Sequence, residues 1–194
     1  MTFRAPDWNA PLDPGIYIDR ASPVATAKGM FFVMVQRELR KVGKLEGVAA
    51  AAPTYRAFKD YPYVDLLKLE VAASEALFPG ESLREGLRRL GHCVFPMFLE
   101  HMIGRVLFGV VGRDPQQLLR LAAKGYAVAA SHGTAEALEV NGTSGVLRLK
   151  NVCNFPTAFH VGVVEGTLKH LELRREVEYD ERALFDVDIR ASWR

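Results

Sequence analysis

The sequence is poor in cysteine. Cys93 and Cys153 are the two cysteines in 194 residues, too few for a disulfide framework. Both lie among apolar residues, which favours two reduced, buried thiols in the reducing environment of the cytoplasm. We therefore predict a cytoplasmic protein held together by a hydrophobic core, since 194 residues are enough for one domain with such a core.

No charge of one sign is in large excess. The 25 lysines and arginines are balanced by 23 aspartates and glutamates, which gives a net charge of +2. A nucleic-acid-binding domain usually presents a strongly basic surface, so this balance argues against nucleic acid as a partner.

An uninterrupted apolar run of membrane-spanning length is also lacking. The longest apolar segment, residues 94–111, contains Glu100, His101 and Arg105, and each of these is costly in lipid. We therefore expect this segment to be a buried helix of a soluble domain and predict no membrane span.

Motifs for phosphate binding, metal binding and catalysis are absent from the sequence. No segment matches the glycine-rich phosphate-binding loops, and His92 and Cys93 are adjacent rather than at metal-ligand spacing. Cys153, with Asn154 beside it and His160 six residues on, is the best arrangement for a nucleophile. No elbow motif surrounds it, and a buried thiol is the alternative. We therefore expect no enzyme activity, no catalytic residues, no metal and no cofactor.

Hydrophobic periodicity predicts that the first part of the chain is helical. Residues 1–14 are expected to form a flexible leader, and residues 15–19 a short strand. Ser82 and Glu85 have the spacing of a capping box, and Asp114-Pro115 is typical of a helix start. Helices are expected at residues 28–44, 65–78, 82–91, 94–111 and from 114 to about 125.

After Gly125 the hydrophobic period changes to two, which predicts antiparallel strands. One helix, at about residues 156–170, is inserted among them. The sequence thus predicts an α+β fold, with N-terminal helices packed on a C-terminal antiparallel sheet, and residues 15–194 as a single domain. Strands are expected at residues 126–131, 134–140, 146–151, 176–179 and 185–190.

Short segments along most of the chain resemble a paralogous family of unknown function known from myxobacteria. The likeness covers most of residues 15–193 and implies a single domain of this size. It implies no activity, because the family has none assigned. The segments are Lys28-Gly29-Met30-Phe31-Phe32, Tyr61-Pro62, Glu85-Gly86-Leu87-Arg88-Arg89-Leu90-Gly91, Gly104-Arg105-Val106 and Val164-Glu165-Gly166.

The predicted order of helices and strands is similar to that of haem-based nitric-oxide and oxygen sensor domains. It is also similar to the related four-vinyl-reductase-like and vesicle-tethering-subunit folds. Most of this likeness lies in the helix at residues 159–170. Such domains hold haem, other small molecules or acyl chains between helices and sheet, or serve as assembly subunits, so the resemblance implies a binding or assembly module.

The residues that a haem sensor needs are missing. Such sensors require a histidine on the helix before the hairpin, and the matching segment, residues 115–120, has none. They also require a Tyr-x-Ser-x-Arg motif for the haem propionates, and the matching segment, residues 150–154, differs at all three motif positions. We therefore expect no haem. His101 is an alternative iron ligand, and a core histidine is the other interpretation.

Aromatic and methionine side chains gather on two of the predicted helices. Such side chains adapt to irregular ligands, although at helical spacing they also form ordinary cores. Glu165 is either a carboxylate in a pocket or the surface partner of Lys169. Gly162 and Gly166 are expected to let their helix sit close to the sheet. The candidate ligand-binding residues are Phe31, Phe32, Met34, Phe95, Phe98, Met102, Phe108 and Glu165.

Two functions follow from these observations. The first, which we favour, is a non-enzymatic regulatory or sensory module that binds a small apolar ligand, without haem, between the N-terminal helices and the sheet. The alternative is a protein-interaction module, a homodimer or an adaptor in a signalling assembly. Its basis is that the helices at 28–44 and 94–111 carry more apolar surface than one sheet face needs.

Overall fold

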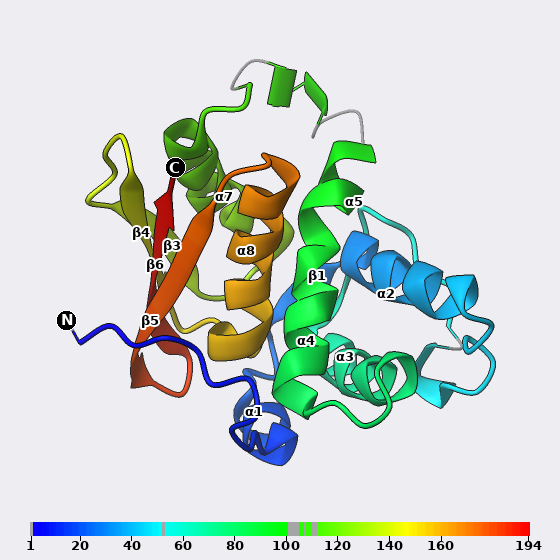
Figure 1. Cartoon of the computed structure of the whole chain (residues 1–194). Coiled ribbons are helices and arrows are strands. Elements are labelled where there is room, and N and C mark those ends of the chain that lie inside the picture. Colours follow the sequence, from blue (N-terminus) through cyan, green and yellow to red (C-terminus); the bar gives the residue numbers. More distant parts are fainter. Residues whose placement is uncertain (1, 52, 101–104, 107, 110–111) are drawn as a thin grey trace.

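The computed structural model describes residues 2–51, 53–100, 105–106, 108–109 and 112–194, which form two packed parts (Figure 1). The helical part contains α1 (Pro14–Arg20), β1 (Thr26–Lys28), α2 (Gly29–Lys41), η1 (Ala49–Ala51), β2 (Asp60–Pro62), α3 (Tyr63–Leu77), α4 (Leu83–His92) and α5 (Val94–Glu100). The sheet part contains α7 (Pro115–Ala129), β3 (Thr134–Leu138), β4 (Ser144–Lys150), the π-helical turn η2 (Pro156–His160), α8 (Val161–His170), β5 (Arg175–Ala183) and β6 (Asp186–Trp193). The predicted α+β fold, with helices packed on a C-terminal antiparallel sheet and one inserted helix, is confirmed.

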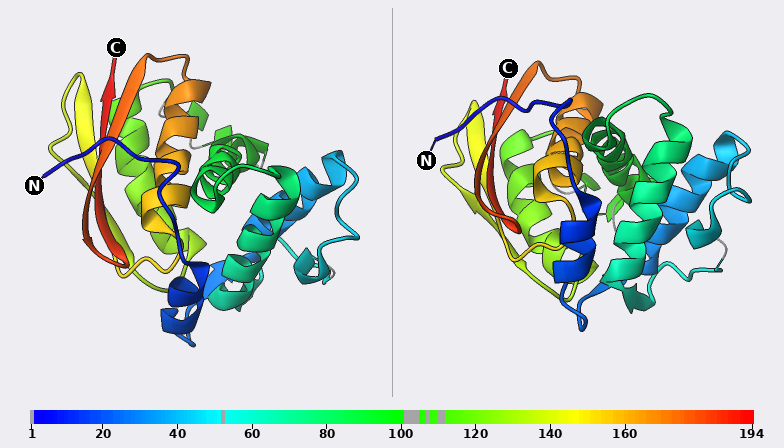
Figure 2. Two further views of the ribbon diagram at one scale, coloured as in Figure 1. Left: turned by 60° about the horizontal axis from the view of Figure 1, so that its bottom comes forward. Right: turned by 90° about the horizontal axis from the view of Figure 1, so that it is seen from below.

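The main sheet has four antiparallel strands in the order β3-β4-β6-β5. Because side chains alternate along a strand, every second residue faces the same side. Figure 2 shows α7 and α8 on one side of this sheet, and the apolar strand residues face that side. They pack against Val161, Val164 and Leu168 of α8. The strand residues of this core are Leu147, Leu149, Val177, Tyr179, Val187, Ile189, Ala191 and Trp193.

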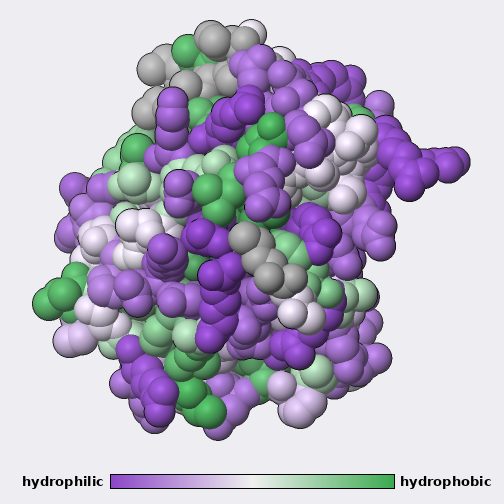
Figure 3. Space-filling view, turned by 90° about the vertical axis from the view of Figure 1, so that its left-hand side faces the viewer, coloured by the Kyte–Doolittle hydropathy of each residue, from purple (hydrophilic) through white to green (hydrophobic). Residues whose placement is uncertain are grey.

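The opposite side of the molecule, beyond the sheet, is largely hydrophilic (Figure 3). Asp188 of β6 is nevertheless fully buried. Its two carboxylate oxygens accept hydrogen bonds from Arg148 of β4 at 2.8 and 2.9 Å. The Arg182 guanidinium also donates to Asp188. These hydrogen bonds, those from Arg148 above all, lower the pKa of Asp188. The buried carboxylate is thus paired on both oxygens, as a buried charge requires.

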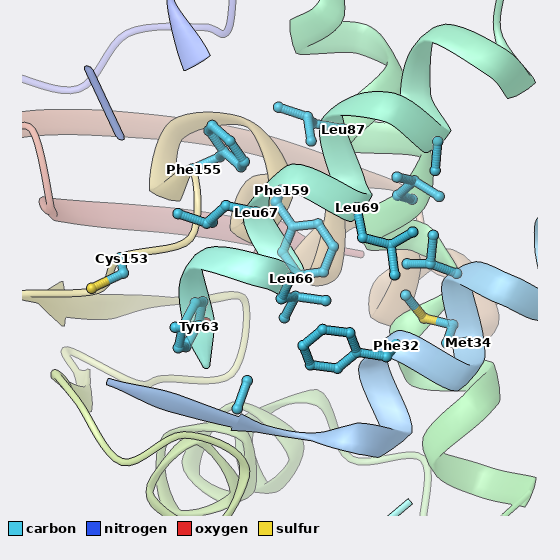
Figure 4. Close-up of a cluster of buried hydrophobic side chains, with 14 of the residues drawn as sticks. Phe32, Met34, Tyr63, Leu66, Leu67, Leu69, Leu87, Cys153, Phe155 and Phe159 are labelled. Carbon is cyan, nitrogen blue, oxygen red and sulfur yellow. The ribbon is translucent and has the colours of Figure 1, made fainter. Parts of the chain in front are cut away.

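The helical part has its own core (Figure 4). Phe32 and Met34 of α2 point into it, beside Leu66 of α3. Phe155 and Phe159, which precede α8 in the chain, belong to the same cluster. The core of the helical part therefore extends into the segment before α8, while the residues against the sheet form a second core.

Two helix starts that the sequence indicates are confirmed. The Ser82 hydroxyl accepts a hydrogen bond from the Glu85 backbone N–H at 3.1 Å at the start of α4. The Asp114 carboxylate accepts one from the Gln116 N–H at 2.9 Å, and Pro115 occupies the first position of α7. Both caps satisfy backbone donors that have no partner within the helix.

Two segments that were expected to be strands are helical. Residues 15–19 lie in α1, because the Asp13 carboxylate accepts from the Gly15 N–H at 2.8 Å and Pro14 stands at the first helical position. Residues 126–129 continue α7, which passes through Gly125. Apart from the backbone of its own helix, a Cβ at Gly125 would meet no described atom within 4 Å. This glycine therefore costs the helix only roughly 1 kcal/mol relative to alanine and does not end it.

The N-terminal segment lies along the edge of the sheet and against α4 (Figure 1). Arg4 and Tyr179 of β5 exchange two backbone hydrogen bonds, at 3.0 and 2.9 Å. Further on, the Trp8 carbonyl accepts a hydrogen bond from the Ser82 hydroxyl, and the Trp8 ring covers the Arg88 guanidinium. Residues that were expected to form a leader thus contact both parts of the fold.

Part of the expected helix at residues 94–111 lies outside the described residues. His101, Met102 and Gly104 are among the residues concerned, whereas α5 covers the start of the segment. In the described part of the chain, no helix combines the length and the apolar character that crossing a membrane requires.

Candidate functional site

Three glycines bring α8 against α4. A Cβ at Gly91 would lie 2.2 Å from the Phe159 carbonyl oxygen, and one at Gly162 would lie 2.2 Å from the Arg88 carbonyl oxygen. A Cβ at Gly166 would lie 2.6 Å from the Cα of His92. Because these neighbours are backbone atoms, none of the three positions accepts a side chain without a shift of a helix. Gly162 and Gly166 were expected to let their helix sit close to the sheet, and this prediction is wrong, because both face α4.

This close contact places Glu165 of α8 beside two basic residues of α4. The Glu165 Oε2 accepts a hydrogen bond from Nε of Arg88 at 2.5 Å and lies 3.0 Å from Nε2 of His92. Burial acts to raise the pKa of Glu165, but the hydrogen bonds and charges of His92 and Arg88 outweigh it, so the pKa is lowered. Glu165 therefore joins α8 to α4 as an ionised carboxylate, and its partners are Arg88 and His92 rather than Lys169.

Half of the predicted ligand-binding residues belong to the helical core. Phe32 and Met34 are completely buried there, and the Phe32 ring stacks on Tyr55 with 4.4 Å between ring centroids. The partly buried Phe31 and Phe98 pack against the same cluster.

The other predicted residues lie elsewhere. Phe95 and Phe108 meet with 5.8 Å between ring centroids, and Phe95 also lies 5.2 Å from the His170 ring at the end of α8. Met102 is outside the described residues, and Glu165 forms the ion pairs with α4. The described members of the predicted set thus occupy three places rather than one.

An apolar pocket lies between α7, α8 and the inner face of the sheet. Its volume is about 40 Å³. Thr167, the polar side chain in its lining, donates its hydroxyl to the Val163 carbonyl at 2.8 Å, so this group is already satisfied within α8. The pocket therefore suits an apolar group. Its lining includes Leu118, Leu119, Val164, Leu168, Ala191 and Trp193.

Local structure fixes the pocket walls. The cap at Asp114 sets the start of α7, which places Leu118 and Leu119 one turn into the helix, where both are buried. A Cβ at Gly145 would lie 2.5 Å from Cδ2 of Leu119. The absence of a side chain at Gly145 therefore lets Leu119 pack directly on the sheet. The Trp193 indole is held by its Nε1–H, which donates to the Gly142 carbonyl at 3.0 Å.

None of the residues that line this pocket is among the ligand-binding residues predicted from the sequence. Two signals were available: the apolar face of α7 and the alternation of apolar residues along β6. Neither signal shows that Leu119 and Trp193 meet, because the two residues are distant in the sequence and only the folded sheet brings them together.

A larger hollow, of about 200 Å³, lies at the start of β5 and the end of β6. Three arginines line it, with Ser192, Glu176 and Trp193, which also lines the apolar pocket. Four of the six lining residues are charged, so the hollow does not match the predicted apolar ligand. The three arginines are Arg174, Arg175 and Arg194.

The candidate nucleophile of the sequence analysis is deeply enclosed. Cys153 is buried, and burial raises the pKa of its thiol. The His160 Nδ1 lies 2.8 Å from the Asn154 carbonyl oxygen, and burial lowers the pKa of His160 to about 4. Near neutral pH both groups are therefore uncharged, which does not favour a reactive thiolate. Across the described residues, no cluster of three or more His, Cys, Asp or Glu side chains is placed to hold a metal ion.

The fold is similar to that of H-NOX proteins. The Fe(II) unliganded H-NOX protein from K. algicida superposes with a TM-score of 0.66 and 17% sequence identity, over 86% of this chain and 96% of that protein. The H-NOX protein from S. oneidensis in the Fe(II)NO ligation state gives a TM-score of 0.68 and 12% identity, over 86% and 99%. An oxygen-binding H-NOX domain related to soluble guanylate cyclases, in its oxygen complex, gives 0.64 and 16%, over 86% and 95%.

At these identities the similarity concerns the fold alone. No curated protein matches the chain. A family of proteins of unknown function, DUF2378, matches residues 20–194, which is nearly the whole chain. The chain therefore belongs to the DUF2378 family.

Proposed function

We propose that this chain is a non-enzymatic regulatory or sensory module that binds a small apolar ligand in the pocket between α7, α8 and the sheet. The observation that carries the proposal is the apolar lining of this pocket, in which the hydroxyl of Thr167 is already satisfied. Two of the structurally similar H-NOX proteins, described as an oxygen complex and an Fe(II)NO ligation state, add support, because that fold takes small ligands in them.

The size of the pocket limits the ligand. A cavity of roughly 10–15 Å³ holds one water molecule, and one of about 150 Å³ holds benzene. The pocket here has about 40 Å³. It therefore has room for a group of a few heavy atoms, such as the end of a hydrocarbon chain, while the rest of a longer ligand would lie at the pocket opening.

We propose that the ligand is bound without haem. Haem iron is held by side chains of His, Cys, Met or Tyr, and the pocket lining contains only Pro, Leu, Ala, Val, Thr and Trp. Tyr126, further along α7, donates its hydroxyl to the His132 carbonyl at 2.7 Å, and burial raises its pKa, which keeps it a neutral phenol.

Trp193 gives a direct test, because it lines the pocket and the chain has only two tryptophans. In a Trp8→Phe background, Trp193 is the single tryptophan. Straight-chain alcohols of increasing length are titrated while its fluorescence is recorded. We expect saturable changes, with an affinity that rises roughly fourfold for each added methylene, from about 0.8 kcal/mol per CH₂. The increase should stop once the pocket is filled.

A matched pair of variants on α7 completes the test. Ala122 is exposed and borders the pocket, whereas Ala127 is exposed on the same helix but is not part of the lining. Ala122→Leu should fill the pocket and weaken binding of the alcohols tenfold or more, while Ala127→Leu should leave binding unchanged. Fluorescence changes that do not saturate, or that are equal in the two variants, would contradict the proposal.

A further inference from the structure

The interior of the helical part contains a carboxyl group with no charged partner among the described residues. Glu70 of α3 is completely buried, and its Oε1 accepts a hydrogen bond from Nδ2 of Asn154 at 3.1 Å. Burial raises the pKa of Glu70 to about 8, although the hydrogen bond from Asn154 acts in the opposite direction. A buried carboxyl of this kind is neutral near pH 7, and its hydroxyl can then donate a hydrogen bond.

Three oxygens around Glu70 have no hydrogen-bond partner among the described protein atoms. They are Oε2 of Glu70 itself, Oγ of Ser74 and Oδ1 of Asn154. Ser74 follows Glu70 by one helical turn, so both side chains lie on the same side of α3. Asn154 contacts Glu70 directly. The three oxygens therefore belong to one place in the core, and leaving each of them unpaired would cost about 1–3 kcal/mol.

The helix α4 closes this place. A Cβ at Gly86 would lie 2.8 Å from Cβ and 3.3 Å from Oγ of Ser74, so the α4 backbone lies directly on the serine. Ser74 and Asn154 are each only 2% exposed. The α4 backbone therefore shields the three oxygens from bulk solvent. A group that satisfies them must be small and must form hydrogen bonds.

The titratable groups around Glu70 are uncharged. Burial raises the pKa of Tyr63 on α3, of Tyr126 on α7 and of Cys153 in the loop before η2. Burial lowers the pKa of His160 on η2 to about 4. None of these groups carries a positive charge near pH 7, so none of them offsets a negative charge on Glu70. Binding of a cation would require a negative charge on Glu70, whereas binding of a neutral molecule would not.

We infer that Glu70, Ser74 and Asn154 hold one internal water molecule, with Glu70 as a protonated carboxylic acid. The water accepts the hydrogen bond from the Glu70 hydroxyl, donates one hydrogen to Oδ1 of Asn154 and shares its other hydrogen bond with Oγ of Ser74. All three oxygens are then satisfied. Buried waters in proteins typically make about three such hydrogen bonds. The inference concerns the core at α3 and α4 and is independent of the apolar pocket.

A crystal structure of the full chain near pH 7, at a resolution that shows ordered water, tests the inference. We expect a density peak about 2.7–3.2 Å from each of the three oxygens. Direct hydrogen bonds among Glu70, Ser74 and Asn154, with no peak between them, would overturn the water site. A peak with the short distances and the higher ligand number of a metal cation would overturn it as well.

The protonation of Glu70 is tested in solution by the pH titration of its side-chain ¹³C carboxyl signal, identified by its loss in Glu70→Gln. We expect a midpoint near pH 8. In Ser74→Ala the water loses one partner, so the ionised carboxylate is less well solvated and the midpoint should move upward. Glu75→Gln removes an exposed carboxyl of the same helix and should leave it unchanged. A midpoint below pH 6 in the unmodified protein would overturn the protonated acid.

Discussion

The carbonyl oxygen of Phe159 lies 2.2 Å from the point where a Cβ of Gly91 would stand. The atoms that a Gly91 Cβ would meet belong to the backbone and cannot rotate away. Gly91→Ala should therefore force α4 away from η2 and destabilise the protein by about 1–3 kcal/mol. Urea unfolding measures the change. Gly125→Ala is the control, since nothing lies within 4 Å of its Cβ, and it should stabilise α7 by up to roughly 1 kcal/mol. Equal effects of the two substitutions would show that α4 does not pack this closely.

Glu165→Gln removes the charge that joins α8 to α4. We expect a loss of about 1–3 kcal/mol at pH 7, because Arg88 and His92 keep their positions beside a neutral amide. The pKa of Glu165 is lowered in the folded protein, so its stabilisation is present above its ordinary pKa of 4.5 and is lost as pH falls through the lowered value. The difference between variant and unmodified protein should therefore shrink in acid.

The control for this prediction is Glu172→Gln. Glu172 pairs with Arg113 at 3.3 Å, but its side chain is 82% exposed, and such surface pairs contribute little. We expect almost no change in the unfolding midpoint at any pH. If Glu165→Gln behaves like Glu172→Gln, the contact between α4 and α8 is not stabilised by the ion pair.

Glu70→Gln should have the opposite pH dependence. The pKa of Glu70 is about 8 in the folded protein against 4.5 ordinarily, so between these values the unfolded chain releases a proton that the folded chain keeps. The stability of the unmodified protein should therefore fall by up to about 1.4 kcal/mol per pH unit from pH 4.5 to 8, and then level off. Glutamine does not titrate, so the variant should gain in relative stability over this window. Chemical unfolding at several pH values measures the difference, and a constant difference would contradict the prediction.

Local signals in the sequence were sufficient for much of the fold. The caps at Ser82 and Asp114 and the alternation along β4, β5 and β6 give the correct element types, because each depends on residues close together in the chain. The prediction was wrong at Gly125, where a glycine was taken as a helix end although one glycine costs a helix only roughly 1 kcal/mol.

The site depended on contacts between distant segments. Glu165 was compared with Lys169, its neighbour on the helix, whereas its partners Arg88 and His92 come from α4. Gly162 and Gly166 indicate that something lies close to α8, but the pattern itself does not say whether it is a sheet or a helix. The pocket likewise needs α7, α8 and two strands together, so no single periodic segment could predict it.

The measurement that tests the central proposal most directly is native mass spectrometry of the purified protein. A ligand bound between α7, α8 and the sheet predicts a mass above the 21.6 kDa of the chain that disappears on denaturation. The added mass should be reduced in Ala122→Leu and retained in Ala127→Leu. A dimer of bare chains, with no added mass in any form of the protein, would contradict the ligand-binding module and favour a protein-interaction module instead.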